Sequence, residues 1–513
     1  MQSLAYKRAS LGHKRHKEPV SRREKLILFW ISINISFCAW ALGGMPFWAQ
    51  CIIFSLSSIS FLSCFVPVGD RYCLDAKSLT PGESFRLLMR FPGFWLALPF
   101  IAYALLQAFN PAWLLEYYDG QVYWLPIYSW ADLPASVKAP ATIQYTSRGA
   151  PFGGMNAFVE LMVFSSGILT LWAVWLGLRS RRAIRFLYWV LCLQASAMGI
   201  FGMIQYWQRD PYHPKIYGMV RSANELYFGS FVYRNHGAVF LYLALGVALA
   251  LFLYYWGRTM RRMERAGPHY LFLLLAGILC ASLVVCASRG GIIAMVFLIA
   301  CACLLGASYF AHALVSSKLW ISLVVGVVLL GGALLFSYVA DKQVLNQRMK
   351  EMVQSVHDPK SGFRYYLYES TVEMFHDHWL WGIGGGSYRY YSPSYMINYE
   401  SFRHKDGPPR LRFRANYAHS DYLQFLAEYG VVGFACMALF FLYWLWKAFA
   451  LRQHYNLLTG MILLTVFIMM LHAFLDFLYY SPAILIVVSV LVASSLKLAQ
   501  CEKNRWNRLG GER

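Results

Sequence analysis

The chain of 513 residues is 58% hydrophobic and only 14% charged. A water-soluble protein of this size cannot bury so much apolar side chain, so the composition excludes the soluble globular classes and predicts an integral membrane protein. The formal net charge of +21 comes from 46 Lys and Arg against 25 Asp and Glu.

Apolar stretches of about 18 to 22 residues recur along the chain, and each is long enough to cross a hydrocarbon core about 30 Å thick as a helix. They predict an all-α, polytopic membrane protein with about 12 transmembrane helices. The predicted spans are residues 26–44, 47–67, 92–109, 157–178, 186–206, 237–256, 269–287, 291–311, 319–340, 431–450, 456–476 and 481–499.

The basic residues are unevenly distributed over this predicted topology. With the N-terminus inside, the inner segments hold 28 Lys and Arg, against 18 outside, and 11 of those 18 lie in one long loop whose charges count little for orientation. Both termini are therefore predicted to be cytoplasmic. Because this distribution over the two sides of the membrane accounts for the net positive charge, we expect no nucleic-acid partner.

The predicted organisation is a basic N-terminus, two groups of spans, a large outer loop with helices of its own, and a short C-terminal tail. The corresponding ranges are 1–25, 26–340 with an outer loop at 110–156, 341–430, 431–499 and 500–513. The first outer loop is rich in Trp and Tyr, which favours anchoring at the membrane interface over stacking on sugar rings. In the large loop, helical patterns are expected at 345–356, 363–379 and 418–429, with a glycine run at 382–386 after the second.

Three charged or titratable residues stand out at predicted helix starts. Arg289 interrupts an apolar run, and a hairpin there places it at the outer mouth, beside the N-terminus of the next span, where an anion is favoured. Arg364 and His419 each begin a predicted loop helix. A guanidinium matches phosphate oxygens, and an imidazole exchanges protons near neutral pH. Each also has a structural alternative. Arg289 can simply mark a turn, Arg364 can pair with Glu369 or a lipid headgroup, and His419 can cap its helix.

His472 and Asp476 are four residues apart in an apolar stretch. On one helix face they form either a proton relay or a mutually satisfied polar pair, and the second interpretation is favoured.

Together these positions resemble the motifs of one family. The runs Trp381-Gly-Ile-Gly-Gly-Gly-Ser-Tyr388 and His419-Ser-Asp-Tyr-Leu-Gln-Phe-Leu-Ala-Glu-Tyr-Gly430 look like the hallmark of the O-antigen ligase and polymerase superfamily. Three more runs are similar to its lesser motifs, in the same order: Arg234-Asn-His236, Ser288-Arg-Gly290 and His472-Ala-Phe-Leu-Asp476. The resemblance covers roughly residues 220 to 485.

The resemblance implies a glycosyltransferase of the bacterial inner membrane. Such an enzyme moves a glycan from a polyprenyl-diphosphate carrier to an acceptor hydroxyl, for instance on a lipid-linked core sugar, at the periplasmic face and without metal or cofactor. The implied catalytic residue is His419, and the implied diphosphate-binding residues are Arg289 and Arg364. Candidate supporting residues are Arg234, Asn235, His236, Asp421, Arg410, Arg412 and Arg414. Ser420 departs from the family, because many members have Asn there.

Several alternatives stay open at this point. A polymerase of the same superfamily uses a growing glycan as acceptor, and a relative that glycosylates protein is a third choice. A secondary transporter explains 12 spans equally well, but transporters usually show two similar halves with charges at the midplane, and this sequence shows neither. A membrane scaffold does not need Arg289, Arg364 and His419 together.

Overall fold

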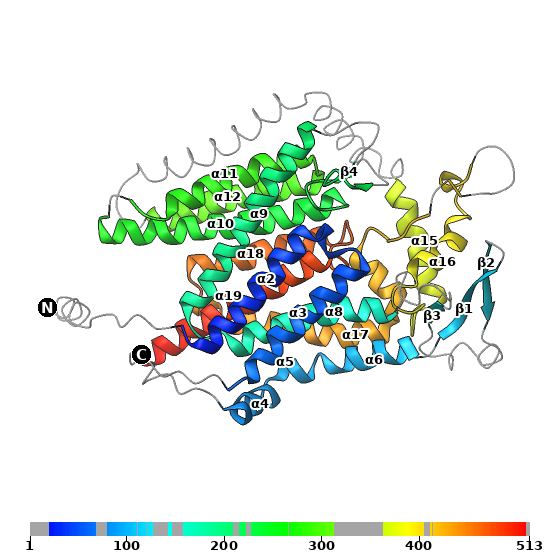
Figure 1. The fold of residues 1–513 in the computed structure, drawn as a ribbon, viewed down its shortest axis with the longest axis horizontal. Coiled ribbons are helices and arrows are strands. Elements are labelled where there is room, and N and C mark those ends of the chain that lie inside the picture. The colour runs from blue at the N-terminus through cyan, green and yellow to red at the C-terminus, as the bar shows by residue number, and fades with distance from the viewer. Residues whose placement is uncertain are drawn as a thin grey trace.

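The computed structural model describes residues 20–67, 80–109, 111–118, 121–126, 142–145, 157–208, 215–221, 227–264, 266–311, 363–404, 411–412 and 414–508. This part of the chain is predominantly helical (Figure 1), which confirms the predicted all-α class. The helices are α2 (Arg22–Trp40), α3 (Phe47–Leu62), α4 (Pro81–Met89), α5 (Pro92–Trp95), α6 (Leu98–Phe109), α8 (Ala157–Gly177), α9 (Arg181–Gln208), α10 (Arg234–Arg262), α11 (His269–Cys286), α12 (Arg289–Ala311), α15 (Phe363–Asp377), α16 (Tyr388–Met396), α17 (Asp421–Ala450), α18 (Leu457–His472) and α19 (Pro482–Arg508).

The described residues contain nine helices that are long and apolar enough to cross a membrane. The protein is therefore a multi-pass membrane protein, and the count of 12 spans stays a prediction. The predicted span 319–340 and the amphipathic helix 345–356 lie outside the described residues. The predicted span 456–476 is wrong at its end, because α18 stops at His472 after 16 residues.

Helix α10 forms the centre of the bundle. Its sequence is apolar on all faces, as expected for a helix surrounded by other helices, and nearly all of it is buried. It packs against α9, α11, α12, α18 and α19. Gly246 lies so close to Thr465 of α18 that a Cβ atom has no room, which is how small residues let membrane helices approach.

Polar contacts tie several helices together at one end of the bundle. The Glu24 carboxylate, in the first turn of α2, accepts hydrogen bonds from the backbone N–H groups of Arg179 and Ser180, each at 2.7 Å. Arg181 at the start of α9 forms an ion pair with Glu502 of α19, also at 2.7 Å. The beginning of α2 and the end of α19 therefore lie at the same end, which we call the basic end.

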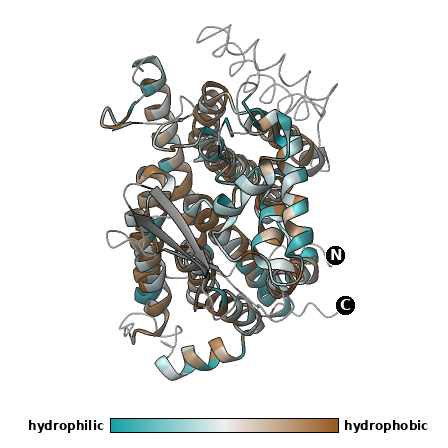
Figure 2. Cartoon of the chain, turned by 90° about the vertical axis from the view of Figure 1, so that its right-hand side faces the viewer, coloured by the Kyte–Doolittle hydropathy of each residue, from teal (hydrophilic) through white to brown (hydrophobic). Residues whose placement is uncertain are grey.

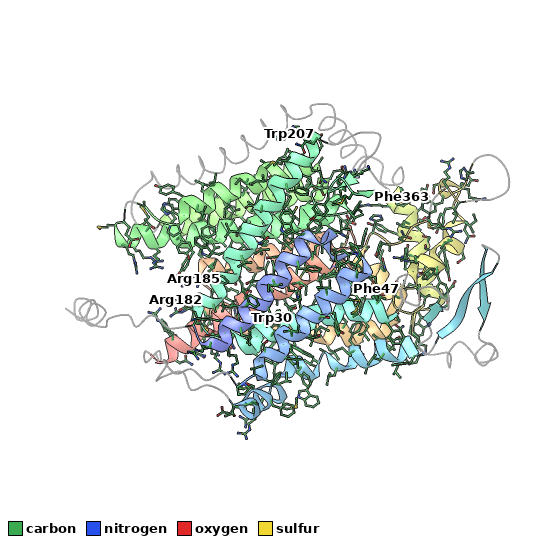
Figure 3. All side chains as sticks on the ribbon, viewed as in Figure 1. Trp30, Phe47, Arg182, Arg185, Trp207 and Phe363 are labelled. Atoms are coloured by element: carbon green, nitrogen blue, oxygen red, sulfur yellow. The ribbon has the colours of Figure 1, made fainter. Side chains whose placement is uncertain are left out.

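The opposite end carries α15 and α16, and we call it the site end. Figure 3 shows Arg182 and Arg185 toward the basic end and Phe363 at the site end. Figure 2 views the molecule from the site end, with the long helices mostly coloured as hydrophobic and polar colour on shorter helices nearer the viewer. The predicted topology, in which the chain termini and the segment 341–430 lie on opposite sides of the membrane, stays a prediction.

Within the described residues, two small sheets lie outside the helical bundle. Strand β1 (Pro111–Tyr118) pairs antiparallel with β2 (Gln121–Pro126) and parallel with β3 (Thr142–Tyr145). Strands β4 (Lys215–Ile216) and β5 (Val220–Arg221) form an antiparallel pair. The sequence analysis did not predict strands in the loop 110–156, although its aromatic residues are typical of β-structure.

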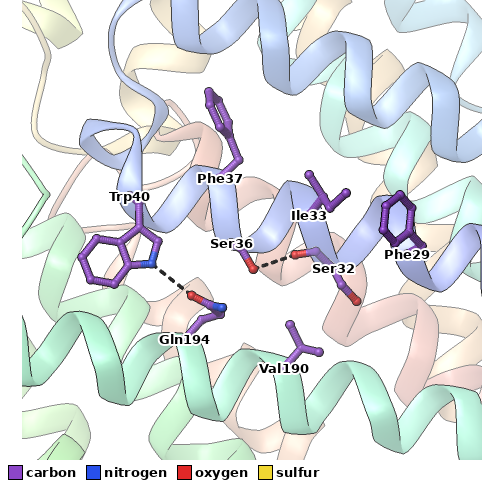
Figure 4. A pocket seen from close by; sticks show the side chains of 8 residues that line it. All are labelled: Phe29, Ser32, Ile33, Ser36, Phe37, Trp40, Val190 and Gln194. Carbon is purple, nitrogen blue, oxygen red and sulfur yellow. Dashed lines mark hydrogen bonds between the residues drawn. The ribbon is translucent and has the colours of Figure 1, made fainter.

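A groove of about 520 Å³ lies between α2 and α9 (Figure 4). The Trp40 indole N–H donates a hydrogen bond to the Gln194 side chain at 3.0 Å across it. The residues that line it are Phe29, Ser32, Ile33, Ser36, Phe37, Trp40, Val190 and Gln194. None of them is a predicted site residue.

The topology predicts opposite labelling of two engineered cysteines in a variant without the 11 native cysteines. Ser401 is exposed at the site end and Asn504 is exposed near the end of α19. In cells with a permeabilised outer envelope and an intact cytoplasmic membrane, an impermeant thiol reagent should label Ser401→Cys. It should label Asn504→Cys only after the cells are broken open, and the reverse pattern would contradict the topology.

Candidate active site

The candidate site is built around Asp476, which lies in the turn between α18 and α19. Its side chain is only 1% exposed. On one side, Oδ1 lies 3.1 Å from Nδ1 of His419 and accepts a hydrogen bond from the backbone N–H of Phe477 at 3.0 Å. On the other, Nη2 of Arg364 lies 3.5 Å from Oδ2, and Nη1 donates to the carbonyl oxygen of Leu475. Asp476 therefore joins two of the three predicted functional residues.

His419 is held by its backbone as well as by its ring. It has φ of +54°, in the left-handed region that a residue other than glycine rarely adopts. The Tyr368 hydroxyl donates to its carbonyl oxygen at 2.9 Å. Its side chain is 22% exposed, and within the described residues no hydrogen-bond partner meets Nε2. With Nδ1–H directed at Asp476, Nε2 is the free acceptor of the imidazole.

The motif at the start of α10, with Tyr233 before it, also converges on Asp476. The Tyr233 hydroxyl donates to Oδ2 at 3.2 Å, and the Asn235 amide donates to the same oxygen. The neighbouring ring of His236 is buried, with Nε2 2.7 Å from the carbonyl oxygen of Phe477. Asn235 and His236 thus fix the turn that carries the carboxylate.

Arg289 is the first residue of α12, as the hairpin between two apolar stretches predicted, and its side chain is exposed. The contact described between its turn and the site runs through Ser288, whose hydroxyl donates to the Asn235 side chain at 2.9 Å. A chain of hydrogen bonds therefore leads from the Arg289 turn through Asn235 to Asp476.

The other predicted supporting residues occupy different surroundings. Asp421 is buried at the start of α17, and its Oδ2 accepts hydrogen bonds from the backbone N–H groups of Leu478 and Tyr479 at 2.7 and 3.0 Å, so it shapes the turn after Asp476. Arg234 is half-buried at the start of α10, and Arg412 and Arg414 are exposed. Arg410 lies outside the described residues.

The glycine run Gly382–Gly386 packs against the kink of α17 at Gly430. Gly382 and Gly430 have φ of +74° and +60°, and a Cβ atom on either would meet the backbone of the other segment. The backbone N–H of Gly384 donates to the Glu428 carbonyl oxygen at 2.9 Å. The predicted special backbone at 382–386 is therefore confirmed, and it serves to join α15 and α16 to α17.

Electrostatics favour the ionised form of Asp476. Burial by itself raises the pKa of this carboxyl group, but the hydrogen bond from His419 and the positive charge of Arg364 together hold the pKa well below its usual value. Burial lowers and the Asp476 charge raises the pKa of Arg364, and the net change is upward. Both groups stay charged at neutral pH.

The expected pair of His472 and Asp476 on one helix face is not what forms. Because α18 ends at His472, the chain turns before Asp476 and points its carboxylate at α15 and at the segment before α17. The His472 ring lies instead beside the Tyr242 hydroxyl, with Nδ1 at 3.3 Å. The position of Asp476 at the centre of the site was therefore not predicted from the sequence. The one sequence signal for this residue was that it belongs to the last motif.

Comparison with known families gives a match. Residues 270–438 match the family model for the O-antigen ligase. This region belongs to the O-antigen ligase superfamily. No curated protein matches the chain significantly. The match to the O-antigen ligase model includes Arg289, Arg364 and His419 but ends before Asp476, so the place of Asp476 rests on the structure alone.

Replacing Asp476 with Asn should remove the charge that holds His419. In assays of the transfer reaction that the resemblance to the O-antigen ligase superfamily implies, we expect turnover to fall by about two to four orders of magnitude, because the amide no longer fixes one tautomer or stabilises a protonated imidazole. Asp377→Asn is the matched control, because Asp377 is exposed at the end of α15 and its carboxylate accepts a hydrogen bond from Tyr395. If Asp476→Asn inserts normally and turns over like the control, Asp476 has no role in transfer.

Proposed function

We propose that this protein is a membrane glycosyltransferase of O-antigen ligase type. It transfers a glycan from a polyprenyl-diphosphate carrier to an acceptor hydroxyl, such as that of a lipid-linked core sugar, on the periplasmic side of the bacterial inner membrane, and it needs no metal or cofactor. The observation that carries the proposal is the contact of His419 and Arg364 with one buried carboxylate, Asp476, inside and beside a region of the O-antigen ligase superfamily.

His419 serves in this proposal as the general base. Its Nε2 takes the proton of the acceptor hydroxyl while the acceptor oxygen forms a bond to the anomeric carbon of the glycan. The charge of Asp476 stabilises the imidazolium that results and keeps Nδ1 protonated throughout. The side chain is partly exposed, as a group that receives a proton from a substrate must be.

Arg364 and Arg289 serve in this proposal on the donor side. When the bond from the anomeric carbon to phosphate breaks, the polyprenyl diphosphate leaves with added negative charge, and fixed cations stabilise it. The Arg364 side chain is 37% exposed although it contacts Asp476, so part of its guanidinium is available to phosphate oxygens. Arg289 lies at the N-terminus of α12, where the free N–H groups of the first turn also favour an anion.

The proposed function is tested with purified protein in lipid, supplied with a labelled polyprenyl-diphosphate glycan and two kinds of acceptor. A ligase moves the label to a lipid-linked core sugar, whereas a polymerase moves it to a second carrier-linked glycan. Label that stays on the carrier with every acceptor would contradict both.

The role of His419 predicts a separation of binding from turnover. His419→Ala should bind the carrier glycan nearly as wild type does, while transfer falls by about two to four orders of magnitude, the usual contribution of a positioned general base. His419→Lys should not restore transfer, because an ammonium group has no lone pair to accept the proton.

His376→Ala is the matched control, since His376 is exposed on α15 outside the cluster. Loss of carrier binding in His419→Ala in proportion to transfer would assign the histidine to the phosphate site instead. Normal transfer would reduce it to a structural residue.

A further inference from the structure

Two carboxyl groups lie buried together beside the glycine run, outside the Asp476 cluster. Glu160 of α8 and Glu428 of α17 are each 0% exposed. Glu428 accepts two hydrogen bonds, from the backbone N–H of Tyr388 at 3.0 Å and from the Tyr480 hydroxyl at 2.7 Å. Neither oxygen of Glu160 has a hydrogen-bond partner in the described part of the chain, although Glu428 and Tyr429 lie next to it.

Glu160 has close neighbours in Tyr429 and the glycine run. The Tyr429 hydroxyl is also buried without a hydrogen-bond partner among the described residues. A Cβ atom on Gly385 would come within 3.2 Å of Oε2 of Glu160 and would collide with that hydroxyl, so the glycine run closes over the pair. A fully buried acceptor without a donor is costly, and the carboxyl group of Glu160 lies next to another carboxyl group, that of Glu428.

Charge balance requires a positive charge between the two groups. In the described residues neither carboxyl forms an ion pair with Lys, Arg or His. Two adjacent carboxylates buried in a low-dielectric region repel each other and lose hydration, so they do not both stay ionised without a cation or a proton. Glu428 accepts two hydrogen bonds that favour its charged form, whereas Glu160 accepts none from the described residues.

We propose that Glu160 and Glu428 share one proton, carried by Glu160, and that ionised Glu428 is a positioning residue for the candidate active site. The Glu160 hydroxyl supplies the missing donor between the two side chains. Glu428 then holds Tyr388, the first residue of α16, and Tyr480, four residues after Asp476.

The hydrogen bonds of Glu428 connect two sides of the candidate active site. Tyr417 stacks face to face on Phe477, with ring centroids 4.1 Å apart, and the guanidinium of Arg389 lies 5.8 Å from the centre of the Tyr417 ring. Arg389 follows Tyr388, and Phe477 follows Asp476. Glu428 therefore sets how the start of α16 and the Asp476 turn meet on either side of Tyr417.

Infrared spectroscopy tests the proton directly on purified protein in lipid at neutral pH. Wild type should show the carbonyl stretch of a protonated carboxylic acid in a dry environment, and Glu160→Gln should lose it. Glu373→Gln, which alters an exposed carboxylate bonded to Tyr399, should keep it. A wild type without the band, or a band that survives in Glu160→Gln, would overturn the shared proton and indicate a bound cation or a different acid.

Transfer assays test the positioning role, and this arm rests on the proposed function. Glu160→Gln should keep turnover within a factor of about three, because its amide can donate to Glu428 as the acid does. Glu428→Gln should lower kcat about 100-fold, as expected when a supporting contact shifts reacting groups by about 1 Å, with little change in KM. An unchanged kcat in folded Glu428→Gln, or an inactive but folded Glu160→Gln, would refute it.

If Glu428→Gln does not fold, Tyr480→Phe decides the question, because it removes only one hydroxyl donor from Glu428. It should lower kcat about tenfold with KM unchanged, and wild-type kcat would refute the positioning role. A wild type without transfer activity would refute the proposed function but leave the infrared result valid.

Discussion

A buried carboxylate is stable only where hydrogen-bond donors and positive charge replace the water it has lost, and Asp476 meets this condition by contacts from separate parts of the chain. Helix α18 ends at His472, so Asp476 lies in the turn that follows it. The segments before α10, at the start of α15 and before α17 each direct a side chain to it.

This arrangement links an electrostatic need to a chemical one. The donors that make Asp476 stable are also the groups that a sugar transfer from a diphosphate requires: a guanidinium for the leaving group and an imidazole with one nitrogen free. Arg364 and His419 keep part of their side chains exposed while the carboxylate between them is shielded. The buried Asp476 can therefore hold its two partners in place, and the partly exposed Arg364 and His419 are the side chains that can reach a substrate.

The membrane class and most helix positions could be predicted from the sequence, because apolar length is a strong local signal. The start of α15, the special backbone at 382–386 and the continuation of α17 through Gly430 followed from local patterns as well. Asp476 could not be placed, because a spacing of four from His472 looks like one helix face and the break between them depends on tertiary contacts. The role of Glu160 could not be predicted, because a single acidic residue near the start of an apolar helix is common. Only the structure shows that Glu428 is its neighbour.

The central claim is that His419 and Asp476 act as one unit, and a double-mutant cycle tests it most directly. Transfer rates would be measured for wild type, His419→Ala, Asp476→Asn and the double variant, with equal amounts of folded protein in lipid. If the two residues form a unit, the double variant should be no slower than His419→Ala alone, because the aspartate has nothing left to orient. Losses that multiply, with the double variant slower than either single variant by the product of both effects, would show that Asp476 acts independently and would contradict the account.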